Sequence, residues 1–181
     1  MVPSSFGEAN IHCLKKSVVA SLPLEHRPIS LLNSDYKLFT KLLAVRLSGL
    51  LPETIDRPQV GFVPGRRIEP TLDIYAAAKI EAVNDEPMRG SLALLLDFAK
   101  AYDSLQSPFL LAVLQWLGFS PKFVKMVEAL HQNTTCRSIV NGYLSRRCNV
   151  LCGICQSCPM AHSCLSLRST ASTESFVPDL Y

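Results

Sequence analysis

The sequence lacks the features of a membrane protein or a secreted protein. Its longest unbroken apolar runs are far too short to cross a bilayer, which takes roughly 20 residues in a helix. Residues 1–10 lack the apolar stretch of a secretory signal. The chain has seven cysteines, an odd number that argues against a secreted disulfide framework. We therefore expect an intracellular protein, in the nucleus or the cytoplasm, with no membrane partner.

Strong charge of either sign is also missing. The formal net charge is only +3 over 181 residues. This mild basicity permits a polyanionic partner such as nucleic acid but does not require one. Apolar residues make up 48% of the chain, which is enough to build the core of one domain or of part of a larger one.

Two aspartates are notable because the first directly follows an apolar run. Residues 92–96 are all apolar, Asp97 comes next, and Asp103 follows six residues later. Such a run is typical of a strand covered on both faces, so Asp97 is expected at the edge of a dry core. A carboxylate there is costly unless a cation, hydrogen bonds or a metal compensates it, which makes Asp97 a site candidate. In the alternative interpretation, Asp97 starts a turn and Asp103 caps the next helix. The spacing alone does not decide between them.

Local patterns predict a first helix over about 34–51. Asn33, Ser34 and Asp35 are good N-cap residues, and Pro52 is expected to stop the helix. Apolar residues at helical spacing form its expected buried stripe: Phe39, Leu43, Leu47 and Leu50.

Further helices and a hairpin follow. Helices are expected over 72–84 and 107–117, and a short one begins at Pro121. The Asn141–Gly142 pair is a strong signal for a tight hairpin turn. We expect Trp116 to pack in the core or against a helix. The expected inner faces are Leu72, Ala76, Ile80 and Val83; Leu110, Leu111, Leu114 and Leu117; and Val124, Val127 and Leu130.

The cysteine spacing leaves a metal-binding alternative open. Cys152, Cys155 and Cys158 are each three residues apart, with Cys148 before them and His162 and Cys164 after them. Thiolates and imidazoles at such spacing can bind zinc or an iron–sulfur cluster. The spacing alone therefore allows a zinc-binding module as an alternative function. A non-catalytic nucleic-acid-binding module is a third interpretation.

Four segments that follow one another along the chain carry a family resemblance. They are Arg27-Pro-Ile-Ser-Leu-Leu-Asn33, Gln59-Val-Gly-Phe-Val-Pro-Gly-Arg66, Leu95-Leu-Asp-Phe-Ala-Lys-Ala-Tyr-Asp-Ser104 and Gly153-Ile-Cys-Gln-Ser-Cys-Pro-Met160. Together they resemble the reverse transcriptases of non-LTR (LINE-type) retrotransposons. The first segment resembles the fingers block, the second the next block, and the third the first catalytic block. The fourth resembles the later block Gly-x-x-Gln-Gly-Cys-Pro-Leu, with Ser157 in place of a glycine. That replacement is expected to impair a close backbone approach or a positive φ angle.

The resemblance implies an α+β fold, a partial right-hand polymerase with fingers and palm, whose helices pack on a small antiparallel sheet. It implies an RNA-directed DNA polymerase that uses an RNA template, a DNA primer and dNTPs. Its cofactor would be Mg²⁺, with Mn²⁺ as a substitute. The implied metal ligands are the catalytic Asp97 and the backbone carbonyl of Phe98. The implied dNTP-binding residues are Lys37, Arg66, Phe98, Tyr102 and Gln156.

The sequence departs from the family at its third catalytic block. That block is an aromatic residue followed by x-Asp-Asp, and this chain has no adjacent aspartates. Two Mg²⁺ ions prefer several hard oxygen ligands, so one aspartate provides too few ligands to hold them. We therefore expect a reverse transcriptase fragment, truncated before this block, with little or no activity alone. The expected division is a poorly patterned segment over 1–26, a partial reverse transcriptase domain over 27–165, and a degenerate, disordered tail over 166–181.

Overall fold

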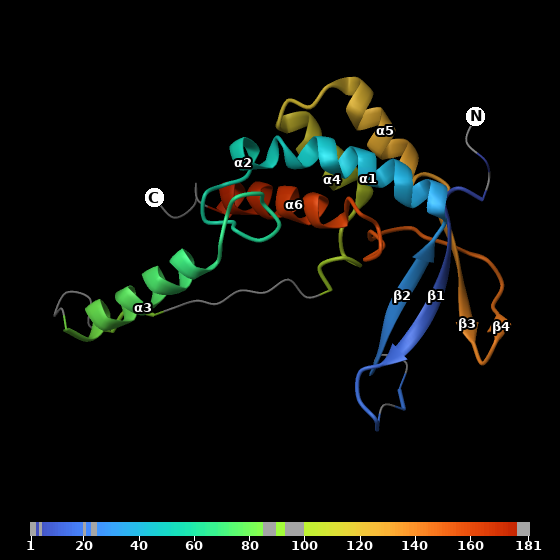
Figure 1. Ribbon diagram of the computed structural model, residues 1–181, viewed down its shortest axis with the longest axis horizontal. Coiled ribbons are helices and arrows are strands. Elements are labelled where there is room, and N and C mark those ends of the chain that lie inside the picture. The colour runs from blue at the N-terminus through green and yellow to red at the C-terminus, as the bar shows by residue number, and fades with distance from the viewer. Residues whose placement is uncertain are drawn as a thin grey trace.

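The computed structural model places a mixed sheet beside a group of helices (Figure 1). It describes residues 3, 5–19, 21–22, 25–84, 90–92 and 100–176, with side chains described as far as residue 170. The strands are β1 Glu8–Lys15, β2 His26–Leu32, β3 Thr135–Val140, β4 Tyr143–Leu144 and β5 Cys148–Asn149. The helices are α1 Ser34–Ser48, α2 Leu51–Thr54, α3 Glu69–Asn84, α4 Ser107–Trp116, α5 Pro121–His131 and α6 Ala161–Phe176.

The sheet has the strand order β2-β1-β3-β4, and β5 also pairs with β3. β1 and β2 are antiparallel with His12 opposite Ile29, whereas β1 and β3 are parallel with Ile11 opposite Ser138. The α+β class is therefore confirmed. The sheet is mixed rather than antiparallel, because the long connection through α1–α5 brings β3 alongside β1 in the same direction.

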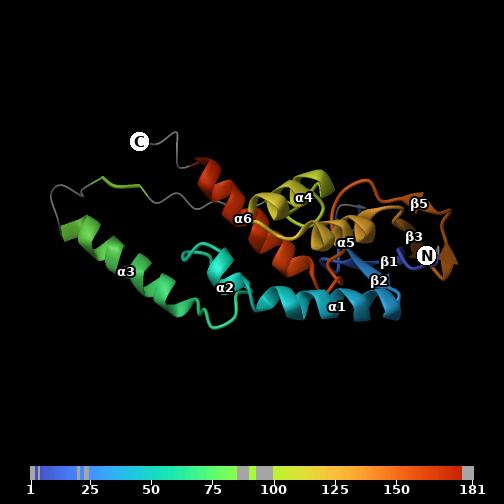
Figure 2. The same cartoon turned by 90° about the horizontal axis from the view of Figure 1, so that it is seen from above.

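The main core lies among α1, α4, α5 and α6, which Figures 1 and 2 show side by side. Leu47, Leu110, Val127 and Leu167 each expose 2% or less of their surface. The expected inner face of α5 is confirmed in full, since Val124, Val127 and Leu130 are all buried. The loops that carry the candidate functional site extend from this group of helices.

The first predicted helix divides into two. α1 ends at Ser48, and Pro52 lies in the first turn of the short helix α2 instead of stopping the first helix. A proline is tolerated there because the first-turn N–H groups have no partner within the helix. Leu43 and Leu47 are buried as expected, but Phe39 and Leu50 are exposed. The buried stripe of α1 is completed by Tyr36, Thr40 and Ala44.

Helix α3 corrects a predicted core face. It has no buried residue, and Leu72, Ile80 and Val83 expose 56%, 65% and 75% of their surface. Both views show α3 extending away from the other helices and from the sheet (Figures 1 and 2). The helical period was right, but periodicity does not show whether a partner covers the face. Trp116, expected to be packed, is likewise 57% exposed.

A hairpin turn and a disordered tail were the two local features predicted for the C-terminal part of the chain. The hairpin is confirmed, with Asn141 at φ 50° and Gly142 at φ 80° between β3 and β4. Residues 166–176, expected to be disordered, form most of α6. There Ser166 donates to the carbonyl of His162 and Thr170 to that of Ser166, so their hydroxyl groups are satisfied within the helix. The ordered region thus extends past residue 165.

Among the residues that the structure describes, none of the helices is long and apolar enough to pass through a bilayer.

Candidate functional site

A close backbone crossing joins residues 102–105 to residues 153–154. The Gly153 N–H donates to the Leu105 carbonyl at 2.8 Å, and the Ile154 N–H donates to the Tyr102 carbonyl at 2.9 Å. Gly153 has φ +88°, and a Cβ atom added there would lie 3.1 Å from both Asp103 Cα and the Tyr102 carbonyl oxygen. Only glycine combines this backbone angle with this approach. Two blocks about 50 residues apart in sequence are therefore held against each other.

A second contact fixes the same segment to the sheet. The Ser157 hydroxyl donates to the carbonyl of Ser30 in β2. Ser157 is not among the residues with positive φ, a conformation that Gly153 adopts instead. Position 157 therefore does not need the positive φ angle of a glycine, and the close approach within the chain lies four residues earlier, at Gly153. The serine adds a hydrogen bond between two of the four blocks.

We expect Ser157→Ala to lower the free energy of unfolding by about 1 kcal/mol, because a partly buried carbonyl loses its donor. Urea unfolding followed by circular dichroism measures this. Ser107→Ala is the matched control, since no hydrogen bond of the Ser107 hydroxyl is present in the described part of the chain. Equal losses in the two variants would show that the Ser157 contact contributes nothing.

A groove of ≈ 380 Å³ opens where these segments meet the sheet. Its polar side chains include Ser30 of β2 and the exposed Asp103 and Gln156. Ile11 of β1 and Cys136 of β3 form part of its floor. A cavity that combines an apolar sheet face with an amide and a carboxylate can hold a planar polar ligand. Gln156, expected beside an incoming nucleotide and its template base, lies on this groove.

The expected phosphate-binding residue Arg66 is engaged elsewhere. Its guanidinium group donates to backbone carbonyls at the end of α2 and in the following turn. These are Pro52 at 2.9 Å, Ile55 at 2.6 Å and Gln59 at 2.7 Å, together with Asp56. Unpaired carbonyls at a helix end are ready acceptors for a cation. Arg66 therefore closes the loop over residues 52–66, and its neighbour Arg67 pairs with Glu69 at 2.8 Å on the surface.

Tyr102 and Lys37 lie apart from the groove lining. The Tyr102 hydroxyl is 2.9 Å from Nδ1 of His162 in α6. Partial burial raises the pKa of Tyr102, so its phenol stays protonated at neutral pH. Lys37 is half-buried in the first turn of α1. The four blocks converge, but they do not place all the expected residues in one cavity.

Asp97 and Phe98, the expected metal ligands, lie outside the described residues. Among the residues that the structure does describe, no group of three or more histidine, cysteine, aspartate or glutamate side chains could hold a metal ion. Asp103 is the carboxylate at the groove, while Glu8 pairs with Arg147 at 2.9 Å. The described residues thus do not by themselves form a binding site for divalent metal ions.

The cysteine-rich alternative is not supported by the packing. All seven cysteines are free, and burial raises the pKa of the Cys155, Cys158 and Cys164 thiols. A zinc site brings about four such ligands together around one point, and the described residues contain no group of three or more potential ligands. Cys158 and Cys164 belong to the hydrophobic core, whereas Cys148 and Cys152 are exposed. The buried thiols of Cys158 and Cys164 therefore have a packing role.

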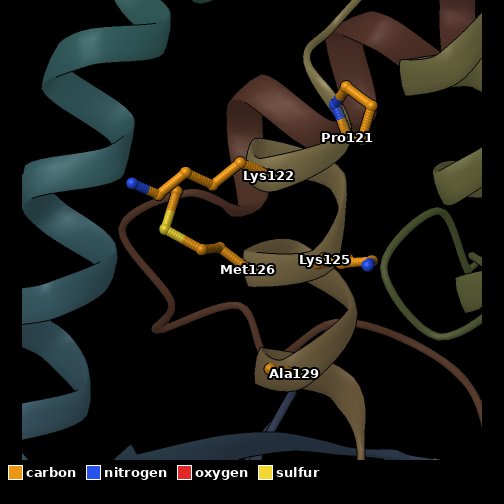
Figure 3. A pocket seen from close by; sticks show the side chains of 5 residues that line it. All are labelled: Pro121, Lys122, Lys125, Met126 and Ala129. Carbon is orange, nitrogen blue, oxygen red and sulfur yellow. The ribbon is translucent and has the colours of Figure 1, made fainter.

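Another hollow lies on a different part of the surface (Figure 3). It has a volume of ≈ 490 Å³ and is lined by Pro121, Lys122, Lys125, Met126 and Ala129, all at or in α5. Figure 3 shows Lys122 and Met126 extending from one side of the helix and Lys125 from another, so these side chains do not converge on a common point. This hollow shares no lining residue with the groove.

Sequence reasoning missed the roles of Gly153, Phe62 and His162. Gly153 was noted only as part of a motif. Its positive φ angle and its close contacts with the backbone of Tyr102 and Asp103 are what require a glycine there. Phe62 and His162 stack on each other with ring centroids 3.9 Å apart. No signal in the sequence indicates this pair, because the two residues are 100 positions apart and neither lies in a periodic pattern.

Comparison with known proteins confirms the family that the four blocks resemble. Residues 14–166 match the family described as reverse transcriptase (RNA-dependent DNA polymerase). The chain is also 30% identical over 174 residues to the "Transposon TX1 uncharacterized 149 kDa protein" of Xenopus laevis. That match covers 89% of this chain but 13% of the relative, so the chain spans a small part of the relative's length. The chain belongs to the reverse transcriptase family.

Proposed function

We propose that this chain is part of the reverse transcriptase domain of a non-LTR (LINE-type) retrotransposon and supplies its surface for template, primer and dNTP. One observation carries the proposal: blocks far apart in sequence, each resembling the family, converge around residues 102–105 and 153–157. The contacts of Gly153 with Leu105 and of Ser157 with Ser30 bring three of them together. The fourth, the 59–66 loop, reaches α6 through the Ser166 hydroxyl, which donates to the Gly61 carbonyl at 3.4 Å.

The residues that the family resemblance singled out suggest individual roles. Gln156, exposed on the groove, would face the nucleotide and the template base. Tyr102 would pack beside the sugar and disfavour a ribose hydroxyl group. Lys37 would approach phosphates from α1. Arg66 would act through the loop that it closes, because its donors are directed at four backbone carbonyls.

Asp97 and the carbonyl of Phe98 would bind Mg²⁺, or Mn²⁺, which in this family activates the primer hydroxyl group and stabilises the leaving phosphate. The described residues contain no group of three or more potential metal ligands, and the chain contains no adjacent aspartates. We therefore infer that the 181-residue chain does not polymerise by itself. Its place of action would be inside the cell, where RNA and dNTPs occur.

Primer extension tests this proposal. The purified chain is incubated with an RNA template, a DNA primer, dNTPs and Mg²⁺ or Mn²⁺, and compared with Asp97→Ala. Asp73→Ala, which removes an exposed carboxylate on α3, is the control. We expect binding of the primer–template without measurable extension by any of the three proteins. Extension that disappears in Asp97→Ala and persists in Asp73→Ala would contradict the inferred inactivity. Folded protein that binds no primer–template would overturn the proposed function.

A further inference from the structure

An aromatic cluster joins three segments that are far apart in sequence. The imidazole of His162 stacks on the ring of Phe62, with centroids 3.9 Å apart and planes 14° from parallel. Tyr102 meets the same imidazole edge-on, with centroids 5.9 Å apart and planes at 80°. The Tyr102 hydroxyl is 2.9 Å from His162 Nδ1. The imidazole is thus held on its face by one neighbour and at a ring nitrogen by another.

The backbone supports Phe62 in an unusual conformation. Phe62 has φ 60°, in the left-handed region that residues other than glycine rarely adopt. Its side chain is 67% exposed, so burial in the core does not hold it there. Instead, two contacts hold the loop that carries Phe62. Arg66 donates to the Gln59 carbonyl, and the Ser169 hydroxyl donates to Gln59 Oε1 at 3.2 Å. A strained backbone that presents an exposed ring to a histidine points to a role for that contact.

Tyr102 is held by hydrogen bonds at its backbone carbonyl and at its side-chain hydroxyl. Its carbonyl accepts from the Ile154 N–H at 2.9 Å, and its hydroxyl contacts His162. The hydrogen bond forms with either tautomer, because the phenol donates to an unprotonated Nδ1 and accepts from a protonated one. A side chain with two rotatable bonds that is held at both ends has one main orientation.

We propose that His162 is a positioning residue for Tyr102, and that its stack on Phe62 couples the 59–66 loop to the Tyr102 ring. The coupling is a property of the fold. Its consequence, a Tyr102 ring held at the nucleotide sugar, rests on the proposed function. Neither His162 nor Phe62 touches the ligand. Both act through the orientation of Tyr102, so that movement of the loop changes the sugar preference of the site.

The coupling is tested by NMR of the whole chain with labelled aromatic rings. We expect the Tyr102 ring resonances to shift in His162→Ala and, without direct contact, in Phe62→Ala. Phe62→Trp should keep the wild-type positions because a tryptophan ring preserves the stack. Tyr143→Ala, which removes an exposed aromatic ring from the β4 hairpin, is the control and should leave Tyr102 unchanged. Phe62→Ala keeps the test valid if His162→Ala does not fold. Unchanged Tyr102 resonances in folded Phe62→Ala would overturn the proposal.

Nucleotide binding separates this inference from the proposed function. The affinities for dATP and ATP are measured by titration for the wild type, Phe62→Ala and Phe62→Trp. We expect the wild type and Phe62→Trp to prefer dATP, and this preference to be lost in Phe62→Ala. If the rings shift but the wild type binds neither nucleotide, the coupling stands and the proposed function fails. If the rings shift and the preference is unchanged, the positioning role is overturned.

Discussion

Gly153→Ala is expected to lower the free energy of unfolding by about 3 kcal/mol. A left-handed backbone angle costs a residue with a Cβ atom roughly 1–2 kcal/mol. The new Cβ would also lie 3.1 Å from backbone atoms of Tyr102 and Asp103, which cannot rotate away as a flexible side chain would. Forcing atoms into such a packed crossing typically costs a further 1–3 kcal/mol. Urea denaturation of the purified variants measures the total.

Gly118→Ala separates the two causes of this loss. Gly118 has a similar angle, φ +78°, but a Cβ atom there would meet nothing within 4 Å. Its substitution should therefore cost only the backbone contribution, about 1 kcal/mol. Equal losses at positions 118 and 153 would show that the crossing is loose. In that case residues 102–105 and 153–154 would not be held together as described.

Arg66→Ala should be nearly as damaging, with an expected loss of about 2–3 kcal/mol. It removes the donors for four carbonyls near the end of α2, and hydrogen bonds to charged groups are worth roughly 1.5–3 kcal/mol each before exposure to solvent reduces them. Arg66→Lys should recover little, because a single ammonium group cannot replace a planar fork of donors. Chymotrypsin cleavage after the exposed Phe62 should accelerate as the loop opens.

The same variant distinguishes a structural arginine from a phosphate-binding one. Arg67→Ala is the matched control, because Arg67 is exposed and pairs only with the neighbouring Glu69 among the described residues. It should leave stability and cleavage nearly unchanged. If Arg66→Ala instead keeps full stability and loses only dNTP affinity, then Arg66 binds the triphosphate, as the family resemblance implied, and does not primarily hold the loop.

The sequence predicted local features well where the signal was local. The Asn141–Gly142 turn requires two positive φ angles, and the residues themselves favour them. The prediction of the buried face of α5 was correct because the other core helices cover its three apolar residues. On α3 the same reasoning failed for Ile80, since helical spacing describes the helix and not its neighbours.

The family was predictable from the sequence, but the contacts among its blocks were not. The order of the blocks indicated the family, and the family implied a role for Gln156 beside the nucleotide, which stays a prediction. The engagement of Arg66 depends on which carbonyls the turn after α2 leaves free, and the stack of Phe62 on His162 depends on tertiary structure alone. Residues 166–181 were interpreted as a degenerate tail because they are rich in serine and threonine and have no strong apolar period. In α6, Ser166 and Thr170 bond the preceding turn and are buried.

Photo-cross-linking tests most directly whether the converging blocks form a nucleic-acid and nucleotide site. An RNA template with a photoreactive base opposite the first dNTP is annealed to a DNA primer, bound to the 181-residue chain at low salt, irradiated and mapped by mass spectrometry. We expect cross-links within residues 100–105 and 149–157, lost when Gly153→Ala separates these segments. Cross-links confined to α3 or α5, or none from folded protein that binds the duplex, would contradict a site at this junction.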